Sequence, residues 1–270
     1  MFNQIIKYLK ILLIIYTITL FILEKLNPQK KYAKKEFKND TNNLIIGFFN
    51  RFLLQFFIKK INKNFVKIIN FNVNALPINE FKTSYGVLTT QEEGSVPPEQ
   101  SSEVFSNKNK KTKNYNIIDF IVKILLIDLY MYLWHRLNHS KYFWLFHKYH
   151  HQDTMMNTTS AVRFSPMEIL FSSIFKNIIL TKLGINKKEQ EFYETLLFFI
   201  IIFHHSNIKI NDAIDNKLEK IITSPSFHRL HHSNKIEDYN NNYGSILSIW
   251  DKIFLTYKKN KPSNIIDFGV

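Results

Sequence analysis

The sequence predicts an all-α fold in which a bundle of about three to four transmembrane helices carries a histidine-rich cap. Three observations predict it. Apolar stretches long enough for membrane helices recur along the 270 residues. Glycine is scarce, at six residues, which favours helices over turn-rich sheets. All ten histidines occur from residue 135 onward, in groups whose spacing suits one face of a helix.

The first expected element is a transmembrane helix over residues 5–23. This stretch is apolar except for Lys7 and Lys10, which lie near one end and can reach the lipid interface. No small-residue cleavage site follows it, so we expect the segment to be retained rather than removed as a signal peptide. Residues 44–58 form a shorter, interrupted apolar stretch, which predicts a tilted or interfacial helix.

A polar segment then divides the chain. Residues 91–116 contain Pro97-Pro98 and a basic run, which is typical of a solvated loop. We therefore expect four regions in chain order: N-terminal membrane helices over 1–75, a polar loop or linker over 76–116, a larger C-terminal domain over 117–257, and a tail over 258–270.

The C-terminal domain begins with a third expected span, over residues 117–134. It carries Asp119, Lys123 and Asp128. Ionisable groups at membrane depth are costly unless they face protein, so we expect these side chains to point into the bundle. Two later apolar runs predict further helices that need not all cross a bilayer.

The charge balance restricts the partners. Lys and Arg number 36 against 22 Asp and Glu, a net charge of +14, and lysines flank the apolar stretches. This distribution is typical of residues beside lipid headgroups, so we expect a membrane partner and no nucleic acid. The absence of Cys excludes disulfide scaffolds, thiolate metal sites and cysteine nucleophiles. Any metal ion must therefore be held by histidine or carboxylate.

The histidines form four groups. They are His135 and His139; His147, His150 and His151; His204 and His205; and His228, His231 and His232. Residues three and four apart share a helix face, so a group can aim two or three imidazoles at one point. The two His-x-x-His-His triplets and the His-x-x-x-His pair indicate metal binding. A single zinc ion takes three or four ligands, so this number suits two metal ions. Imidazole accepts Fe, Zn, Cu or Ni, so residue type alone does not select the metal.

The order of these groups resembles the fatty acid hydroxylase / sterol desaturase superfamily of membrane non-haem di-iron enzymes. Residues 128–151, DLYMYLWHRLNHSKYFWLFHKYHH, look like the first two histidine boxes of that family. Residues 203–208, FHHSNI, resemble a segment that usually reads Gln-His-Ser-Asn, which gives His205 the ligand position. Residues 224–233 and 241–257 look like the last box and its trailing Tyr-Gly and Trp-Asp motifs. The likeness is greatest to the alkylglycerol monooxygenase and bacterial sterol-desaturase-like branch.

The resemblance implies a membrane-bound di-iron oxygenase that hydroxylates or desaturates a lipid such as a sterol, a fatty acyl chain or a glyceryl ether. It implies two Fe ions, with Zn an alternative in purified protein, together with O2 and electrons from a cytochrome b5-like or ferredoxin-like donor. It implies the bacterial inner membrane or the endoplasmic reticulum, with the active site on the cytosolic side. Two alternatives stay open: a membrane metal-binding or transport protein, and a catalytically silent lipid-binding member of the family.

The resemblance also assigns the site residues. The expected catalytic metal ligands are His135, His139, His147, His150, His151, His205, His228, His231 and His232, with His204 as a tenth candidate. Residues carried over by likeness as support for these ligands are Asn157, Arg163, Asn207, Tyr243, Trp250 and Asp251, and Trp250 could equally be core packing. Independently, Asp128 lies two helical turns before His135 and could orient its ring; a helix-interior hydrogen bond or ion pair is the alternative.

Overall fold

The computed structural model describes residues 2–31, 36–73, 116–259 and 266–270. Residues 1–56 and 116–270 form one compact unit, and residues 57–115 form another. The polar loop expected over 76–116 lies outside the described residues, apart from residue 116. The described part of the second unit is the end of a long helix.

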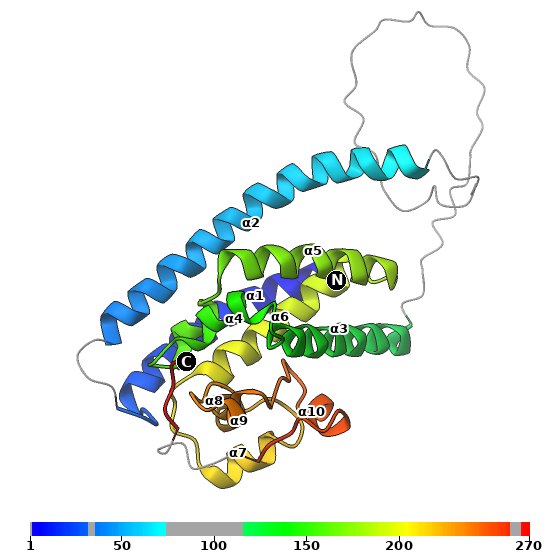
Figure 1. Ribbon diagram of the computed structural model, residues 1–270. Coiled ribbons are helices and arrows are strands. Elements are labelled where there is room, and N and C mark those ends of the chain that lie inside the picture. The colour runs from blue at the N-terminus through cyan, green and yellow to red at the C-terminus, as the bar shows by residue number, and fades with distance from the viewer. Residues whose placement is uncertain (1, 32–35, 74–115, 260–265) are drawn as a thin grey trace, which may run out of the picture. The chain divides into compact units, whose positions relative to one another are not determined.

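The described residues contain helices and isolated β-bridges but no strand, which confirms the all-α prediction. In chain order the helices are α1 (Phe2–Leu26), α2 (Glu36–Val73), α3 (Ile117–Asn138), α4 (Trp144–His151), the 3-10 helix η1 (Thr158–Val162), α5 (Pro166–Lys182), α6 (Lys187–His205), α7 (Asp212–Leu218), α8 (Pro225–His231), α9 (Ile236–Tyr239) and α10 (Ile249–Ile253) (Figure 1).

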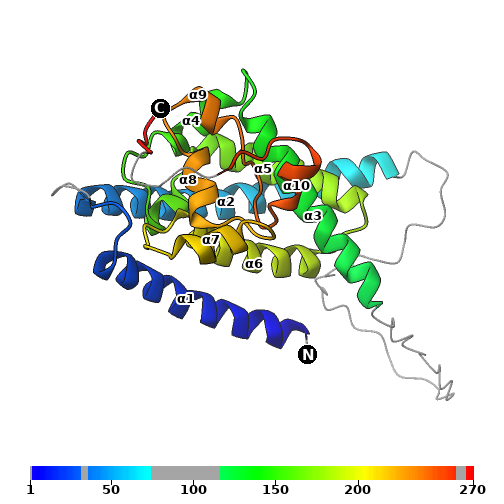
Figure 2. The ribbon, with the colours of Figure 1, turned by 90° about the horizontal axis from the view of Figure 1, so that it is seen from below.

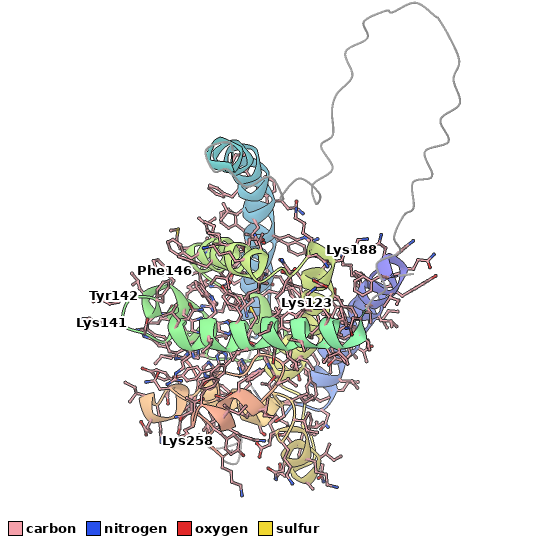
Figure 3. All side chains as sticks on the ribbon, turned by 90° about the vertical axis from the view of Figure 1, so that its right-hand side faces the viewer. Lys123, Lys141, Tyr142, Phe146, Lys188 and Lys258 are labelled. Carbon is pink, nitrogen blue, oxygen red and sulfur yellow. The ribbon has the colours of Figure 1, made fainter. Side chains whose placement is uncertain are left out.

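Helix α6 packs against several other helices of the first unit. It contacts α1, α3, α8 and η1, and α1 runs along it in Figure 2. Its start is fixed by a capping box: the Asn186 side chain accepts from the backbone N–H of Glu189, whose carboxylate accepts from the Asn186 N–H. Lys123 of α3 pairs with the same Glu189, at 3.2 Å, near Lys188 (Figure 3). This ionisable residue therefore faces protein, as expected.

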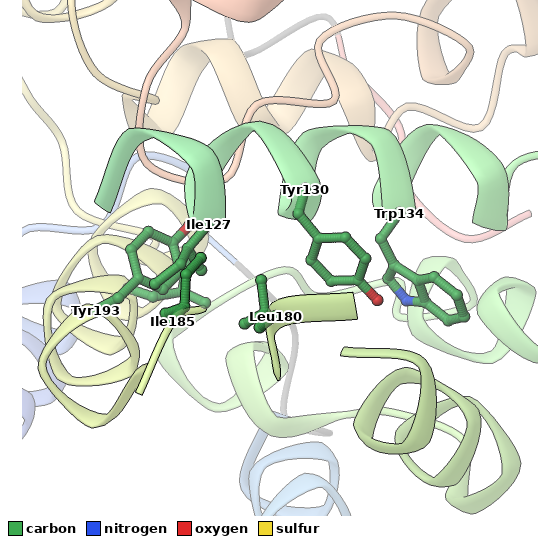
Figure 4. Packing of buried hydrophobic residues seen from close by; sticks show 7 residues of the cluster. Ile127, Tyr130, Trp134, Leu180, Ile185 and Tyr193 are labelled. Carbon is green, nitrogen blue, oxygen red and sulfur yellow. The ribbon is translucent and has the colours of Figure 1, made fainter. Parts of the chain in front are cut away.

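The main hydrophobic core lies between α3, α5 and α6 (Figure 4). Helix α3 contributes Ile127, Tyr130 and Trp134, whose spacing of three and four residues places them on one face. They pack against Leu180 at the end of α5 and, from α6, Tyr193. This core fixes the helix whose last turn carries the first histidines.

Asp128 connects α3 to α6 and to residues 246–250, which include the start of α10. Its carboxylate accepts from the Tyr193 hydroxyl at 2.6 Å and the Trp250 Nε1 at 2.8 Å, and from two backbone N–H groups at 3.2 Å, those of Ile246 and Leu247. Of the two roles expected for Asp128, these contacts favour the structural hydrogen bond, because both of its oxygens accept from residues 246–250 and from α6. Trp250 is its partner rather than a contact of the histidines.

Three buried carboxylates join the N-terminal helices to the segment around η1. Glu24 of α1 accepts from the backbone N–H groups of Thr158 and Asn207, both at 2.9 Å. Asp40 of α2 accepts from the Asn157 amide at 2.7 Å. The third, Asp153, accepts from side chains of α2 and η1; the donors are Asn39, Asn43 and Ser160. Helix α1 and the part of α2 up to residue 56 thus belong to the same unit as the C-terminal domain.

One helix of the described residues is long and apolar enough to be a candidate membrane span. It is α1, with a mean hydropathy of 2.1 over its most apolar window, of which 11% is buried. A bundle of three to four spans is not confirmed. The expected spans over 117–134 and 44–58 do not pass this test of length and composition: the first carries three ionisable residues, Asp119, Lys123 and Asp128, and the second is short.

Asp128→Asn should destabilise the protein by about 2–4 kcal/mol, because an amide nitrogen cannot accept from these donors and leaves some of them unpaired. We expect the melting temperature in detergent to fall by about 5 °C or more. Trp250→Phe, which removes one donor, should cost less. An unchanged melting temperature for Asp128→Asn would contradict this role.

Candidate metal centre

The histidines lie at the ends of α3 and α6 and in the short helices α4 and α8. His135 lies in the last turn of α3 and His139 at its C-cap. The first triplet occupies α4, and the second occupies α8 and its C-cap. Helix α8 starts where Pro225 follows Ser224, whose side chain caps the first turn. Nearly all of these rings are buried in the protein.

The rings gather into two groups, and the ligand nitrogens within each group lie within 4.8 Å of one another. The five-histidine group is His135, His139, His147, His151 and His231. The four-histidine group is His150, His205, His228 and His232. These are the nine ligands expected from the sequence.

Each His-x-x-His-His triplet is divided between the two groups. In α4, His147 and His151 join the five-histidine group while His150 joins the other. The last triplet is divided in the opposite sense, since its middle member, His231, joins the five-histidine group. Residues four apart share a helix face and adjacent residues do not, so a triplet serves two points rather than one.

Most of the rings are held in place through Nδ1. The acceptors are the carbonyl oxygens of Tyr243 (to His135, 2.8 Å), Arg163 (to His150, 2.9 Å), Ile201 (to His205, 2.8 Å) and Asn241 (to His231, 2.7 Å), the Asn240 side-chain oxygen (to His139, 3.4 Å) and the Glu168 carboxylate (to His147, 2.7 Å). A carbonyl oxygen can only accept, so these Nδ1 atoms carry the proton. Each such neutral ring then presents an Nε2 lone pair.

These lone pairs face one another. The Nε2 atoms of His135 and His231 lie 2.9 Å apart, and those of His150 and His205 lie 3.2 Å apart. Each of the four rings donates its single N–H, at Nδ1, to a backbone carbonyl. Neither pair of Nε2 atoms can therefore form a hydrogen bond while the rings are neutral. A cation bound to both nitrogens of a pair would accept both lone pairs.

Protonation of these buried rings could also relieve the repulsion between the lone pairs, but it is unfavourable. Burial, together with the neighbouring imidazoles, holds the pKa of His150 and that of His231 well below the ordinary value. The Nε2 atoms of His139, His147, His151 and His232 are also buried without a hydrogen-bond partner. Neutral imidazoles with unsatisfied Nε2 atoms are the donor set that Fe, Zn, Cu or Ni accept, so the residues fit two metal ions.

The tenth histidine stands apart from both groups. The Thr223 hydroxyl donates to the Ser245 carbonyl, so it accepts from His204 Nδ1, at 2.9 Å. The His204 ring stacks on that of His228 with centroids 3.8 Å apart. Its Nε2 is buried without a partner. His204 therefore lies against a ligand, and its role as a ligand remains a prediction.

Three of the supporting residues expected from the sequence act close to the ligands. Arg163 and Tyr243 do so through their backbone carbonyls, which anchor His150 and His135. Asp251 accepts from the backbone N–H groups of Tyr243 and Gly244, at 2.8 and 2.7 Å, and so fixes the turn that carries one of these carbonyls. By contrast, the side chains of Asn157 and Asn207 contact the N-terminal helices and the chain that follows α1.

Sequence reasoning missed Glu168, which accepts from a ligand ring. It lies in the first turn of α5, behind the capping residue Ser165. An acidic residue at that position is ordinarily explained by the helix dipole, so the sequence gives no sign of its partner. Sequence reasoning also missed Asn240 and Asn241, whose oxygens accept from His139 and His231. They lie outside the histidine motifs, so their spacing gave no sign of these contacts.

Comparisons with known proteins give the family of the chain. The sequence profile of the fatty acid hydroxylase family matches residues 120–256. An ornithine lipid hydroxylase of Rhizobium tropici is 28% identical over 151 residues, covering 56% of this chain and 45% of the relative. Human alkylglycerol monooxygenase is 32% identical over 133 residues, 49% of this chain and 29% of the relative. The chain thus spans less than half the length of these relatives. No solved structure matches the chain.

The two groups should bind metal separately. Wild-type protein should hold about two metal ions per chain, measured by mass spectrometry after reconstitution under reducing conditions. His228→Ala/His232→Ala and His139→Ala/His151→Ala should each retain about one ion, because each pair empties a different group. Lys141→Ala, at an exposed position, is the control and should retain both. Loss of both ions from either double variant would contradict the division into two separate groups.

Metal-free protein should lose stability as the pH falls below about 6.5, the ordinary pKa of histidine. Below this pH the histidines of the unfolded chain bind protons, whereas the buried rings of the folded protein stay neutral. The free energy of unfolding therefore falls by about 1 kcal/mol per pH unit for each such ring. Melting temperatures at pH 7.5 and 5.5 test this. His150→Gln/His231→Gln should show a smaller difference between the two. A pH dependence equal to that of the wild type would contradict the assignment.

Proposed function

Because this chain belongs to the fatty acid hydroxylase family, as its sequence resemblance indicated, we propose that it is a membrane-bound di-iron oxygenase that hydroxylates or desaturates a lipid. The observation that carries the proposal is the pair of buried histidine groups, which comprise the nine ligands expected from the family motif. Bound iron would supply the activation of O2 for attack on an unreactive C–H bond.

The protein's own contribution is to hold neutral nitrogen ligands in a dry site. Backbone carbonyls fix the rings of His135, His150 and His231, so their Nε2 atoms are oriented before any ion arrives. The imidazole shell carries no charge, so these ligands would leave the positive charge of a bound ion uncompensated. Burial of the rings also excludes water from the reacting groups.

The apolar surface of the N-terminal helices supports a membrane location. Large apolar side chains of α1 and of the first part of α2 are more than half exposed; they include Tyr8, Leu12, Ile14, Ile15, Ile45, Phe48, Phe49 and Phe52. An exposed apolar surface on this scale is unfavourable in water and favourable in lipid. We propose that the chain contributes to a bundle of about three to four spans in the bacterial inner membrane or the endoplasmic reticulum, with the site at the cytosolic bilayer surface.

The relatives suggest the class of substrate. One is named for an ornithine lipid and another for alkylglycerols, and both kinds of compound combine hydrocarbon with a polar group. We propose a membrane lipid of this general form, with a fatty acyl chain, a glyceryl ether or a sterol as the hydrocarbon. Electrons would come from a cytochrome b5-like or ferredoxin-like donor, which the positive net charge of the chain would attract if the donor is acidic.

His150→Ala and His231→Ala should each abolish lipid oxidation, because each removes a ligand from a different metal group. We expect O2 consumption by proteoliposomes supplied with reductant, and the oxidised lipids seen by mass spectrometry, to fall to background. Lys141→Ala, at an exposed position beyond α3 (Figure 3), is the control and should keep wild-type activity. Activity retained in both histidine variants would contradict the proposed mechanism.

A further inference from the structure

Glu168 is a buried acid whose role the family resemblance does not assign. Its side chain is 6% exposed, and its Oε1 accepts from His147 Nδ1 at 2.7 Å. The same Oε1 accepts from the Asn138 side-chain amide at 3.3 Å. Its Oε2 is buried without a hydrogen-bond partner. This carboxylate is therefore directed at the metal centre rather than at a neighbouring cation.

Glu168 differs in kind from the other anchors. Five further ligand rings bond through Nδ1 to neutral oxygens, which belong to backbone carbonyls or to the Asn240 amide. Among the hydrogen bonds of the described residues, the His147 ring alone of the nine donates to a carboxylate. Asp153 acts on His205 only through space, since its own oxygens accept from other donors.

A charged acceptor changes what the ligand can do. A carboxylate pulls the Nδ1 proton and makes the opposite nitrogen a stronger donor to a metal ion. It also supplies negative charge near a buried cation that five neutral imidazoles leave uncompensated. The four-histidine group has no such hydrogen bond in the part of the chain described, so the two metal positions are electrostatically unequal.

Glu168 also acts on the helix that carries two other ligands. Asn138 lies between His135 and His139 at the end of α3. By accepting from Asn138 and from His147, one oxygen joins α3, α4 and α5 at the edge of the five-histidine group. The position of three of the five rings thus depends on this carboxylate.

We propose that Glu168 is a positioning residue and the counter-charge of the five-histidine group, and that it strengthens metal binding at that group and not at the other. This inference rests on the proposed function only for the identity of the ion, which would be iron. The difference in affinity between the two histidine groups is expected for any divalent cation that imidazole binds. Glu168→Gln preserves the size of the side chain and an acceptor oxygen while removing the charge.

Co2+ binding to the metal-free full-length protein in detergent, followed by visible absorption, tests this. Wild type should bind two equivalents, and Glu168→Gln should bind one of them about 10- to 100-fold more weakly. Glu168→Asp, which keeps the charge, should fall between the two. Glu189→Gln is the matched control, because it also removes a buried carboxylate from a first helical turn, and it should leave both affinities unchanged.

The outcomes separate the two proposals. Two wild-type affinities in Glu168→Gln, or equal weakening of both sites, would overturn the role of Glu168. Weakening of one site to the same extent in Glu168→Asp as in Glu168→Gln would also overturn it, because charge would then not matter. An asymmetric loss of Co2+ with no lipid oxidation by iron-loaded wild type would leave the Glu168 inference standing and overturn the proposed function.

Discussion

The structure depends on one constraint, which is that buried imidazole lone pairs face each other with no proton to share. Backbone carbonyls take the Nδ1 protons of His135 and His231, whose Nε2 atoms lie 2.9 Å apart. Facing lone pairs repel, and protonation of these buried rings is costly, so a cation bound to both nitrogens would stabilise the arrangement. The same holds for His150 and His205. The fold can therefore be understood as a frame that keeps these nitrogens together.

Helix packing and buried carboxylates together form that frame. Helix α6 and the core beneath α3 position the helix ends from which the rings project. Beyond them, Asp128 and Asp251 fasten the loop whose carbonyl at Tyr243 anchors His135. Glu24 and Asp40 fasten the N-terminal helices to the segment around η1. Buried carboxylates thus recur wherever a loop near the metal centre must be held, because a charged acceptor can satisfy several buried donors at once.

The sequence predicted the helical class, and the nine histidines that spacing and the family resemblance single out are the nine that the structure gathers into two groups. It did not predict how the ligands divide. His150 and His151 are adjacent yet serve different groups, and this follows from the direction of each ring in the folded helix. It also left the role of Asp128 open, since spacing along one helix does not reveal that Tyr193 and Trp250 donate to it from other parts of the chain. Glu168 and the carbonyl anchors were beyond sequence reasoning because their contacts depend on tertiary folding.

Anomalous diffraction at the iron absorption edge, from crystals of the iron-reconstituted protein, tests the central claim most directly. The account predicts two iron peaks, one among His135, His147 and His231 and the other among His150, His205 and His232. A single peak, or iron bound outside these two groups, would contradict the claim that the buried histidines form a centre for two metal ions.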